Sequence, residues 1–171
     1  MLDSLTKVGK VGLGIFVVGV VVFVVGFSVP YWVAFETSKW RFGLWEACVS
    51  GWQSNTYCVS TLSEDFRAFP DLPGWFKGTQ ACACFALLSI IADIVLRGLF
   101  IARKLKHFLL ISVVLDIAAG ALALLGAVIF GSEINKYDHI SLSWGFAFDI
   151  IGGILLGGSA VCFFIEYCRR R

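Results

Sequence analysis

The sequence predicts an all-α membrane protein, a four-helix transmembrane bundle with a disulfide-closed loop on one side. Composition is the first observation, because 58% of the 171 residues are hydrophobic and only 15% are charged. Soluble domains carry about 45–50% apolar and about 25% charged residues. The second observation is that the apolar residues gather in four long runs. The third is a pair of cysteines in the polar segment after the first run, which indicates an oxidising compartment on that side.

Each apolar run is long enough to cross a bilayer as a helix. A hydrocarbon core of about 30 Å needs about 20 residues at the helical rise, and helices satisfy their own backbone polar groups there. We expect one four-span domain with spans at about 11–32, 79–102, 108–131 and 144–167, a first outer loop at 33–78 and a second at 132–143. The first run exceeds the ~7–15 apolar residues of a cleaved signal peptide, so we interpret it as an uncleaved anchor.

Basic residues predict that both termini are cytoplasmic. Short loops rich in Lys and Arg stay inside. The basic positions on one side are Lys7, Lys10, Arg103, Lys104, Lys106, Arg169, Arg170 and Arg171. On the opposite side, Trp32 and Trp144 are expected in an outer aromatic belt at the membrane surface.

Rows of small residues mark close helix packing. Gly12, Gly19 and Gly26 share one face of the first run, Ala119, Ala123 and Ala127 recur in the third, and Gly153 and Gly157 in the fourth. Such rows let helix backbones approach closely in lipid. They predict packing within the bundle or, as the alternative, contact between copies.

The first outer loop is expected to hold a β-hairpin. Cys48 and Cys58 flank a segment with a turn-like Ser-Gly and a polar Gln-Ser-Asn-Thr stretch, which suits a hairpin with a disulfide across its strands. Closing a loop of this length stabilises the fold by about 2–3 kcal/mol in the chain-entropy model.

The same loop resembles that of the claudin superfamily, which includes the peripheral myelin and epithelial membrane proteins. The motif reads Trp32, then Gly43-Leu44-Trp45, then Cys48 and Cys58, on a four-span chain. The resemblance covers essentially the whole chain. It implies a left-handed four-helix bundle with a small antiparallel extracellular sheet built mostly from the first outer loop, in which these six residues define the fold.

The resemblance also implies a function and a place. Claudins polymerise within the plasma membrane and meet claudins of the next cell. The expected role is therefore a junction protein at cell–cell contacts that self-associates in cis and in trans, or with another claudin-like protein, and contributes to adhesion or a paracellular barrier. The alternative is an accessory subunit that regulates an ion channel or receptor, as relatives in this superfamily do.

Three departures qualify the resemblance. The spacing from Trp32 to Gly43 is shorter than in vertebrate claudins, which indicates a divergent or invertebrate member. The chain ends in arginines without the hydrophobic C-terminal residue that PDZ scaffolds bind, so such a scaffold is not expected. Pore-forming claudins carry a charge just after the second cysteine, where this chain has Val59.

Ionisable residues inside the spans form a second group of candidates. Asp93 and Asp116 lie at matching depths in neighbouring spans, and Arg97 is one turn from Asp93 on the same face. These three residues predict a polar clasp between helices, or else a cation or proton site or a docking point for a partner's helix. Asp149 lies near the outer end of the fourth span, where solvation by the outer loops would explain it.

The remaining candidates are few. Cys168, beside the terminal arginines, is a candidate palmitoylation site. His107 and His139 fall on opposite sides of the membrane, and no nucleophile–base pair or phosphate loop occurs. Cys82 and Cys84 lack accompanying metal ligands. We therefore expect a membrane protein embedded in lipid that is not an enzyme, with no cofactor, no metal and no nucleic-acid partner.

Overall fold

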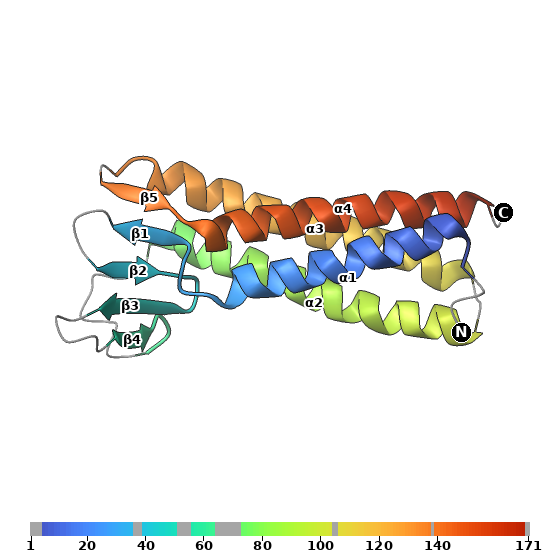
Figure 1. The fold of residues 1–171 in the computed structure, drawn as a ribbon, viewed down its shortest axis with the longest axis horizontal. Coiled ribbons are helices and arrows are strands. Elements are labelled where there is room, and N and C mark those ends of the chain that lie inside the picture. Colours follow the sequence, from blue (N-terminus) through green and yellow to red (C-terminus); the bar gives the residue numbers. More distant parts are fainter. Residues whose placement is uncertain are drawn as a thin grey trace.

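The computed structural model describes residues 5–35, 39–50, 56–63, 73–103, 106–137 and 139–169. Four helices form an elongated bundle: α1 (Lys7–Ser28), α2 (Gly74–Arg103), α3 (Lys106–Ile134) and α4 (Trp144–Arg169). Five short strands form a sheet at one end of it: β1 (Val33–Phe35), β2 (Trp40–Phe42), β3 (Glu46–Ser50), β4 (Thr56–Ser60) and β5 (Ile140–Leu142). Helix α1 begins and α4 ends at the opposite end (Figure 1).

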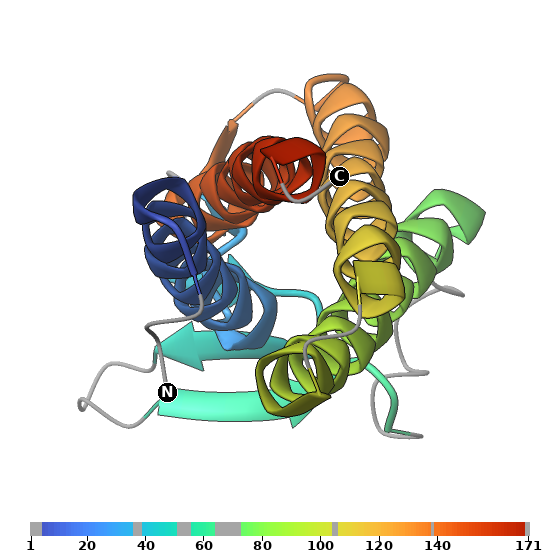
Figure 2. The same ribbon diagram turned by 90° about the vertical axis from the view of Figure 1, so that its right-hand side faces the viewer.

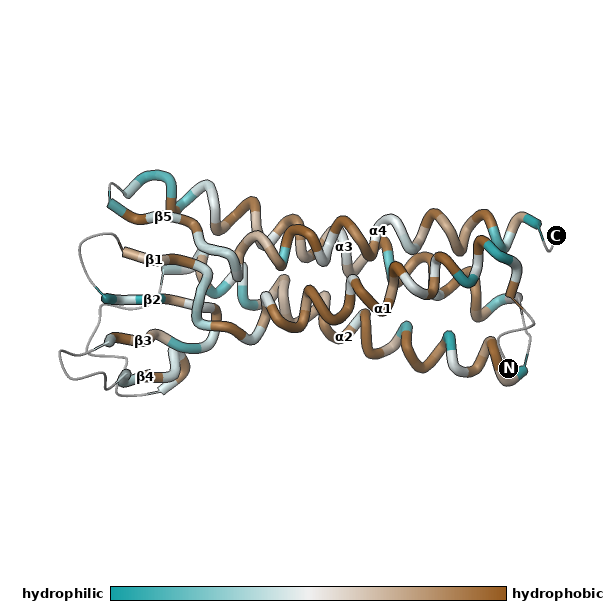
Figure 3. The backbone as a smooth tube through the Cα atoms, viewed as in Figure 1, coloured by the Kyte–Doolittle hydropathy of each residue, from teal (hydrophilic) through white to brown (hydrophobic). Residues whose placement is uncertain are grey.

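All four helices are long and apolar enough, by length and composition, to cross a membrane. Large apolar side chains cover their outer surfaces, including Val17, Leu88 and Val128, which are 53%, 59% and 66% exposed. The hydrophobic colour in Figure 3 follows the helices along most of their length. An exposed apolar surface of this extent fits lipid rather than water, so the fold indicates a multi-pass membrane protein.

Local sequence sets the helix ends, which differ from the expected spans. Helix α1 begins at Lys7 rather than residue 11, because the Thr6 hydroxyl accepts a hydrogen bond from the Gly9 backbone N–H at 3.4 Å. It ends at Ser28 rather than residue 32, because Pro30 disfavours helical backbone in the residue before it. Helix α2 begins at Gly74, directly after Pro73 and five residues before the expected start.

Small residues let the helices approach one another inside the bundle. A methyl group added to Gly12, Gly19 or Gly26 of α1 would lie within 3.0 Å of α4. Ala119, Ala123 and Ala127 are likewise buried. Helix α4 packs against α1 and α3, and α3 packs against α2, whereas α1 and α2 barely touch (Figure 2). The rows on α1 and α3 and Gly153 of α4 therefore pack within the bundle, which is the first of the two interpretations, whereas a methyl group at Gly157 would meet no atom within 4 Å.

The sheet joins both outer loops. Its strands run in the order β4-β3-β2-β1-β5, all antiparallel. Four strands come from the first loop and β5 from the second, which matches the expected sheet. Cys48 pairs with Cys58 across β3 and β4, as the hairpin interpretation requires. The turn expected between these strands, residues 51–55, lies outside the described residues, as do Lys104 and the last two arginines.

Candidate functional site

The joint between the bundle and the sheet is built around Trp32, which is buried inside the protein. Its indole Nε1 donates a hydrogen bond of 2.7 Å to the Gly26 carbonyl at the outer end of α1. The rings of Phe130 and Phe146 pack edge-on against it, with centroids 5.0 and 5.7 Å away. Because Trp32 is only 1% exposed, its placement in an aromatic belt was wrong. Trp144, 43% exposed, keeps a surface position.

The Gly43-Leu44-Trp45 segment continues this joint. A methyl group at Gly43 would stand 2.4 Å from the Val29 carbonyl oxygen, so only glycine fits between β2 and the end of α1. Leu44 is fully buried. Trp45 packs on Phe27 of α1 with a centroid distance of 5.1 Å. The sequence motif thus corresponds to the contact that seats the sheet on the helices.

Two polar side chains that sequence reasoning missed complete the joint. Gln80 of α2 donates from Nε2 to the Leu44 carbonyl at 2.7 Å, and the Thr61 hydroxyl donates to the same carbonyl at 3.0 Å. Both side chains are buried. An amide inside the first turns of an apolar run was the signal that could have identified Gln80, since such a group needs a partner.

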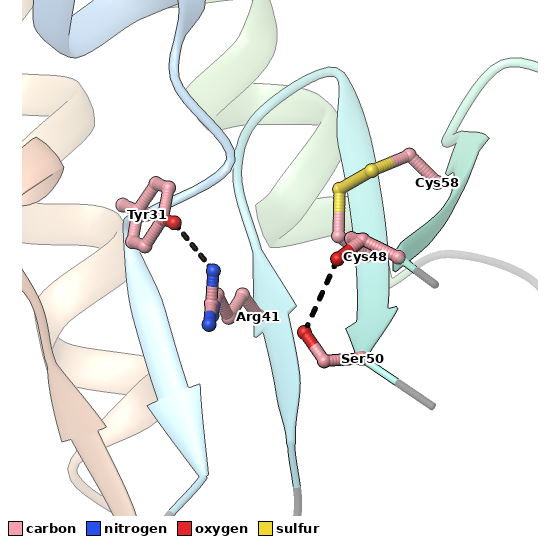
Figure 4. The surroundings of a disulfide bond; sticks show 6 residues. Tyr31, Arg41, Cys48, Ser50 and Cys58 are labelled. Carbon is pink, nitrogen blue, oxygen red and sulfur yellow. Dashed lines mark hydrogen bonds between the residues drawn. A yellow bond between two sulfur atoms is a disulfide. The ribbon is translucent and has the colours of Figure 1, made fainter. Parts of the chain in front are cut away.

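The expected disulfide between Cys48 and Cys58 is present. It lies on the same face of the sheet as Arg41, whose Nη1 donates to the Tyr31 hydroxyl and whose guanidinium lies 5.0 Å from the Tyr31 ring centre (Figure 4). Glu46 places a carboxylate within 4.8 Å of both sulfur atoms. Disulfide sulfurs carry no thiolate, so this trio offers no metal site while the bond is intact.

The sheet ends in a fully exposed edge strand. All five residues of β4 are exposed, with Tyr57 at 64%, and Leu62 just beyond it is 72% exposed. In the described part of the chain, β4 pairs with β3 only. An edge of this kind is a template for pairing with another chain. Val59, directly after Cys58 and named above as a departure from the resemblance, is 39% exposed on this strand.

A second site lies in the interior of the bundle, where the structure brings Asp93, Arg97 and Asp116 together. Arg97 donates from Nε to Asp93 Oδ2 at 2.7 Å and from Nη2 to Asp116 Oδ2. The three residues are 0%, 4% and 1% exposed, in that order. The Arg97 guanidinium therefore links α2 to α3 through Asp116, while Asp93 pairs with it one turn away on α2 itself.

Aromatic rings enclose this cluster. The guanidinium carbon of Arg97 lies 4.0 Å from the ring centre of Phe16 on α1 and 3.9 Å from that of Phe163 on α4. Both contacts are close enough for cation–π attraction. The arginine thus contacts side chains of all four helices, although the sequence indicated only its two aspartates.

Two other acidic residues of the described helices are buried, Asp149 and Glu166. Asp149 is 1% exposed and packs beside Gly26, so its expected solvation by the outer loops was wrong. Glu166 is fully buried at the opposite end, where it accepts hydrogen bonds from the backbone N–H at 3.3 Å and from the hydroxyl of Thr6. Sequence reasoning did not assign Glu166 this role at the start of α1.

The free cysteines of the described chain are Cys82, Cys84, Cys162 and Cys168. Cys168 is exposed near the end of α4, as acylation would require, and its palmitoylation stays a prediction. No protein-family model matches the sequence, and no curated protein is significantly similar to it. The function is therefore inferred from the sequence motif, the fold and these two sites.

Proposed function

We propose that this protein is a claudin-like junction protein of the plasma membrane, whose outer sheet associates with other copies and contributes to adhesion or a paracellular barrier. The observation that carries the proposal is the exposed edge strand β4 on a sheet that packs against the ends of four apolar helices. An exposed edge offers backbone hydrogen bonds to a further strand, and the packing of the sheet on the helices sets its direction.

The distribution of charge supports an extracellular sheet. Lys7, Lys10, Arg103 and Arg169 all lie toward the end of the bundle opposite the sheet, and basic ends stay in the cytoplasm. The disulfide at the sheet end fits the oxidising side of the membrane. A tag fused before α1 should accordingly be reached by antibody only after the cells are permeabilised.

The surface chemistry of β4 favours adhesion over ion selection. Its exposed apolar side chains, Tyr57 and Val59, suit burial against another protein surface. In claudins that form pores, the position of Val59 holds a charge. A barrier or adhesive contact follows more directly from this strand than a selective pore.

The test is expression in cells that lack junction strands. The wild type should concentrate at borders between two expressing cells and raise the electrical resistance of the layer. Tyr57→Lys should abolish this concentration without lowering the surface amount, because lysines on an edge strand oppose pairing.

Tyr137→Lys is the matched control, since Tyr137 is also exposed at the sheet end (54%) but lies outside the strands. It should behave as the wild type. A wild type that spreads evenly over the membrane would overturn the proposal, and co-purification of a channel from the same cells would then favour the accessory role.

A further inference from the structure

The buried charge cluster of Asp93, Arg97 and Asp116 does not balance its own charge. Two ionised carboxylates and one guanidinium would leave a net charge of −1 at a place where none of the three residues is more than 4% exposed. An uncompensated charge in an apolar interior costs several kcal/mol, and intramembrane acids are paired for this reason.

No described neighbour supplies the missing positive charge. The rings of Phe16 from α1 and Phe163 from α4 contact the Arg97 guanidinium. Ser112 is buried one turn before Asp116 on α3, and buried Ser159 of α4 donates to the Gly12 carbonyl at 3.3 Å. The basic residues nearest along these helices are Lys10 and Lys7 on α1, Arg103 on α2 and His107 on α3, all exposed toward the helix ends. On α4, Glu166 adds a further acid and is occupied with Thr6.

We propose that this cluster is a proton-binding site, in which Asp93 and Asp116 together hold one proton and Arg97 balances the remaining negative charge. Each carboxyl uses its Oδ2 on Arg97 and keeps a buried Oδ1 with no hydrogen-bond partner in the described chain. Two acids that share one site do not both ionise readily, so the free oxygens are where the proton resides.

A proton fits these atoms better than a metal ion does. Hard cations take several oxygen ligands, and the described buried oxygens without partners here are Asp93 Oδ1, Asp116 Oδ1 and Ser112 Oγ. Arg97 Nη1 is also buried without a partner and brings positive charge to the same cluster, which opposes a second cation. A proton needs only one oxygen and leaves the cluster neutral.

Proton binding makes stability fall as pH rises. Above about pH 3.9, an aspartate freed by unfolding loses its proton while the folded cluster keeps its own. The folded state then binds one proton more than the unfolded state, and the folding equilibrium constant falls about tenfold per pH unit until the cluster releases that proton. The site therefore links the packing of α2 on α3 to pH.

Asparagine variants test the charge count, because asparagine resembles a protonated aspartate. Asp93→Asn or Asp116→Asn alone leaves one carboxylate for Arg97, so either should keep the folding constant at neutral pH within a few-fold and lose the one-proton pH slope. The double variant isolates Arg97 and should lower the constant about a hundredfold or more. If the folding constant of either single variant were as low as that of the double variant, the proposal would be overturned.

Infrared spectroscopy of the full chain in lipid nanodiscs reads the proton directly. The wild type should show the C=O stretch of a protonated carboxyl, shifted in D₂O and absent from both single variants. Asp149→Asn and Glu166→Gln are controls for the other buried acids and should retain this band. A band unchanged by Asp93→Asn and Asp116→Asn would contradict the proposal, as would stabilisation of the wild type by sodium chloride but not by choline chloride.

Discussion

The joint beneath the sheet and the charge cluster inside the bundle connect helices in opposite ways. At the joint, Trp32 and Gln80 donate to backbone carbonyls at 2.7 Å, and the contacts are neutral. In the cluster, Arg97 joins two carboxyl groups that share one proton in our proposal, and one oxygen of each aspartate has no hydrogen-bond partner in the described chain. The two hydrogen bonds of the joint involve no titratable group, although the Trp45 indole N–H there is buried without a partner in the described chain. The cluster depends on a proton, so its stability changes with pH.

The two kinds of contact suit the joint and the cluster to different structural roles. Buried hydrogen bonds between neutral groups contribute about 1 kcal/mol each and fix geometry, which suits a platform for an outer sheet. Buried ion pairs contribute little net stability but are costly to break. The joint therefore sets the direction of the sheet, and the cluster makes α2 and α3 depend on each other.

Removing Arg97 should have the largest effect. Arg97→Gln leaves Asp93 and Asp116 buried without a counter-ion and should cost about 3–5 kcal/mol, read as loss of folded protein in detergent thermal melts. Arg41→Gln, an arginine at the sheet that contacts Tyr31, should cost about 1 kcal/mol or less. Adding Asp93→Asn and Asp116→Asn to Arg97→Gln should restore much of the stability, and failure to do so would show that packing rather than charge matters at Arg97.

Gly43→Ala should be the most damaging single change at the joint. Its methyl group would lie 2.4 Å from the Val29 carbonyl oxygen and 2.6 Å from the Pro30 Cα. Both of these atoms belong to the backbone, so relief requires moving β2 away from the end of α1. We expect a loss of about 3 kcal/mol and a lower melting temperature. Gly78→Ala on α2, where a methyl group has open space, should be neutral or slightly stabilising. Equal melting temperatures for the two variants would contradict the close approach.

Much of the bundle could be predicted from sequence because its signals are local. Four long apolar runs give four helices, and the spacing of Asp93 and Arg97 places both on one face. The matching depth of Asp116 in the neighbouring span correctly predicted that it lies beside Asp93 and Arg97. The disulfide followed from two cysteines in one short polar loop.

The joint could not be predicted in detail because its contacts connect distant segments. Ser143 of the second outer loop donates its backbone N–H to the Trp32 carbonyl, and β5 pairs with β1 more than a hundred residues away. A tryptophan next to a membrane span is typical of a surface anchor. Trp32 is buried because Phe130 of α3 and Phe146 of α4 pack against it. Helix periodicity and composition do not predict such contacts between distant segments.

Breaking the disulfide should have an intermediate effect confined to the sheet. Replacing Cys48 and Cys58 together by serine removes a cross-link worth about 2–3 kcal/mol, and β4 then depends on its pairing with β3. We expect β4 to lose hydrogen-exchange protection while the interior faces of α2 and α3 keep theirs. Cys82→Ser, which removes a free cysteine on α2, should leave β4 unchanged. Loss of protection in the helices of the disulfide variant would show that the two regions are coupled.

The smallest effect should come from the pair of donors on the Leu44 carbonyl. Gln80→Leu removes the bond at 2.7 Å, and Thr61→Val removes the bond at 3.0 Å. Each change leaves the other donor in place, so each should cost only about 1 kcal/mol. The double variant leaves a buried carbonyl without a donor and should cost more than the sum, by about 1 kcal/mol. Strict additivity in thermal melts would mean that water replaces the lost donors and that the joint is less closed than its buried side chains indicate.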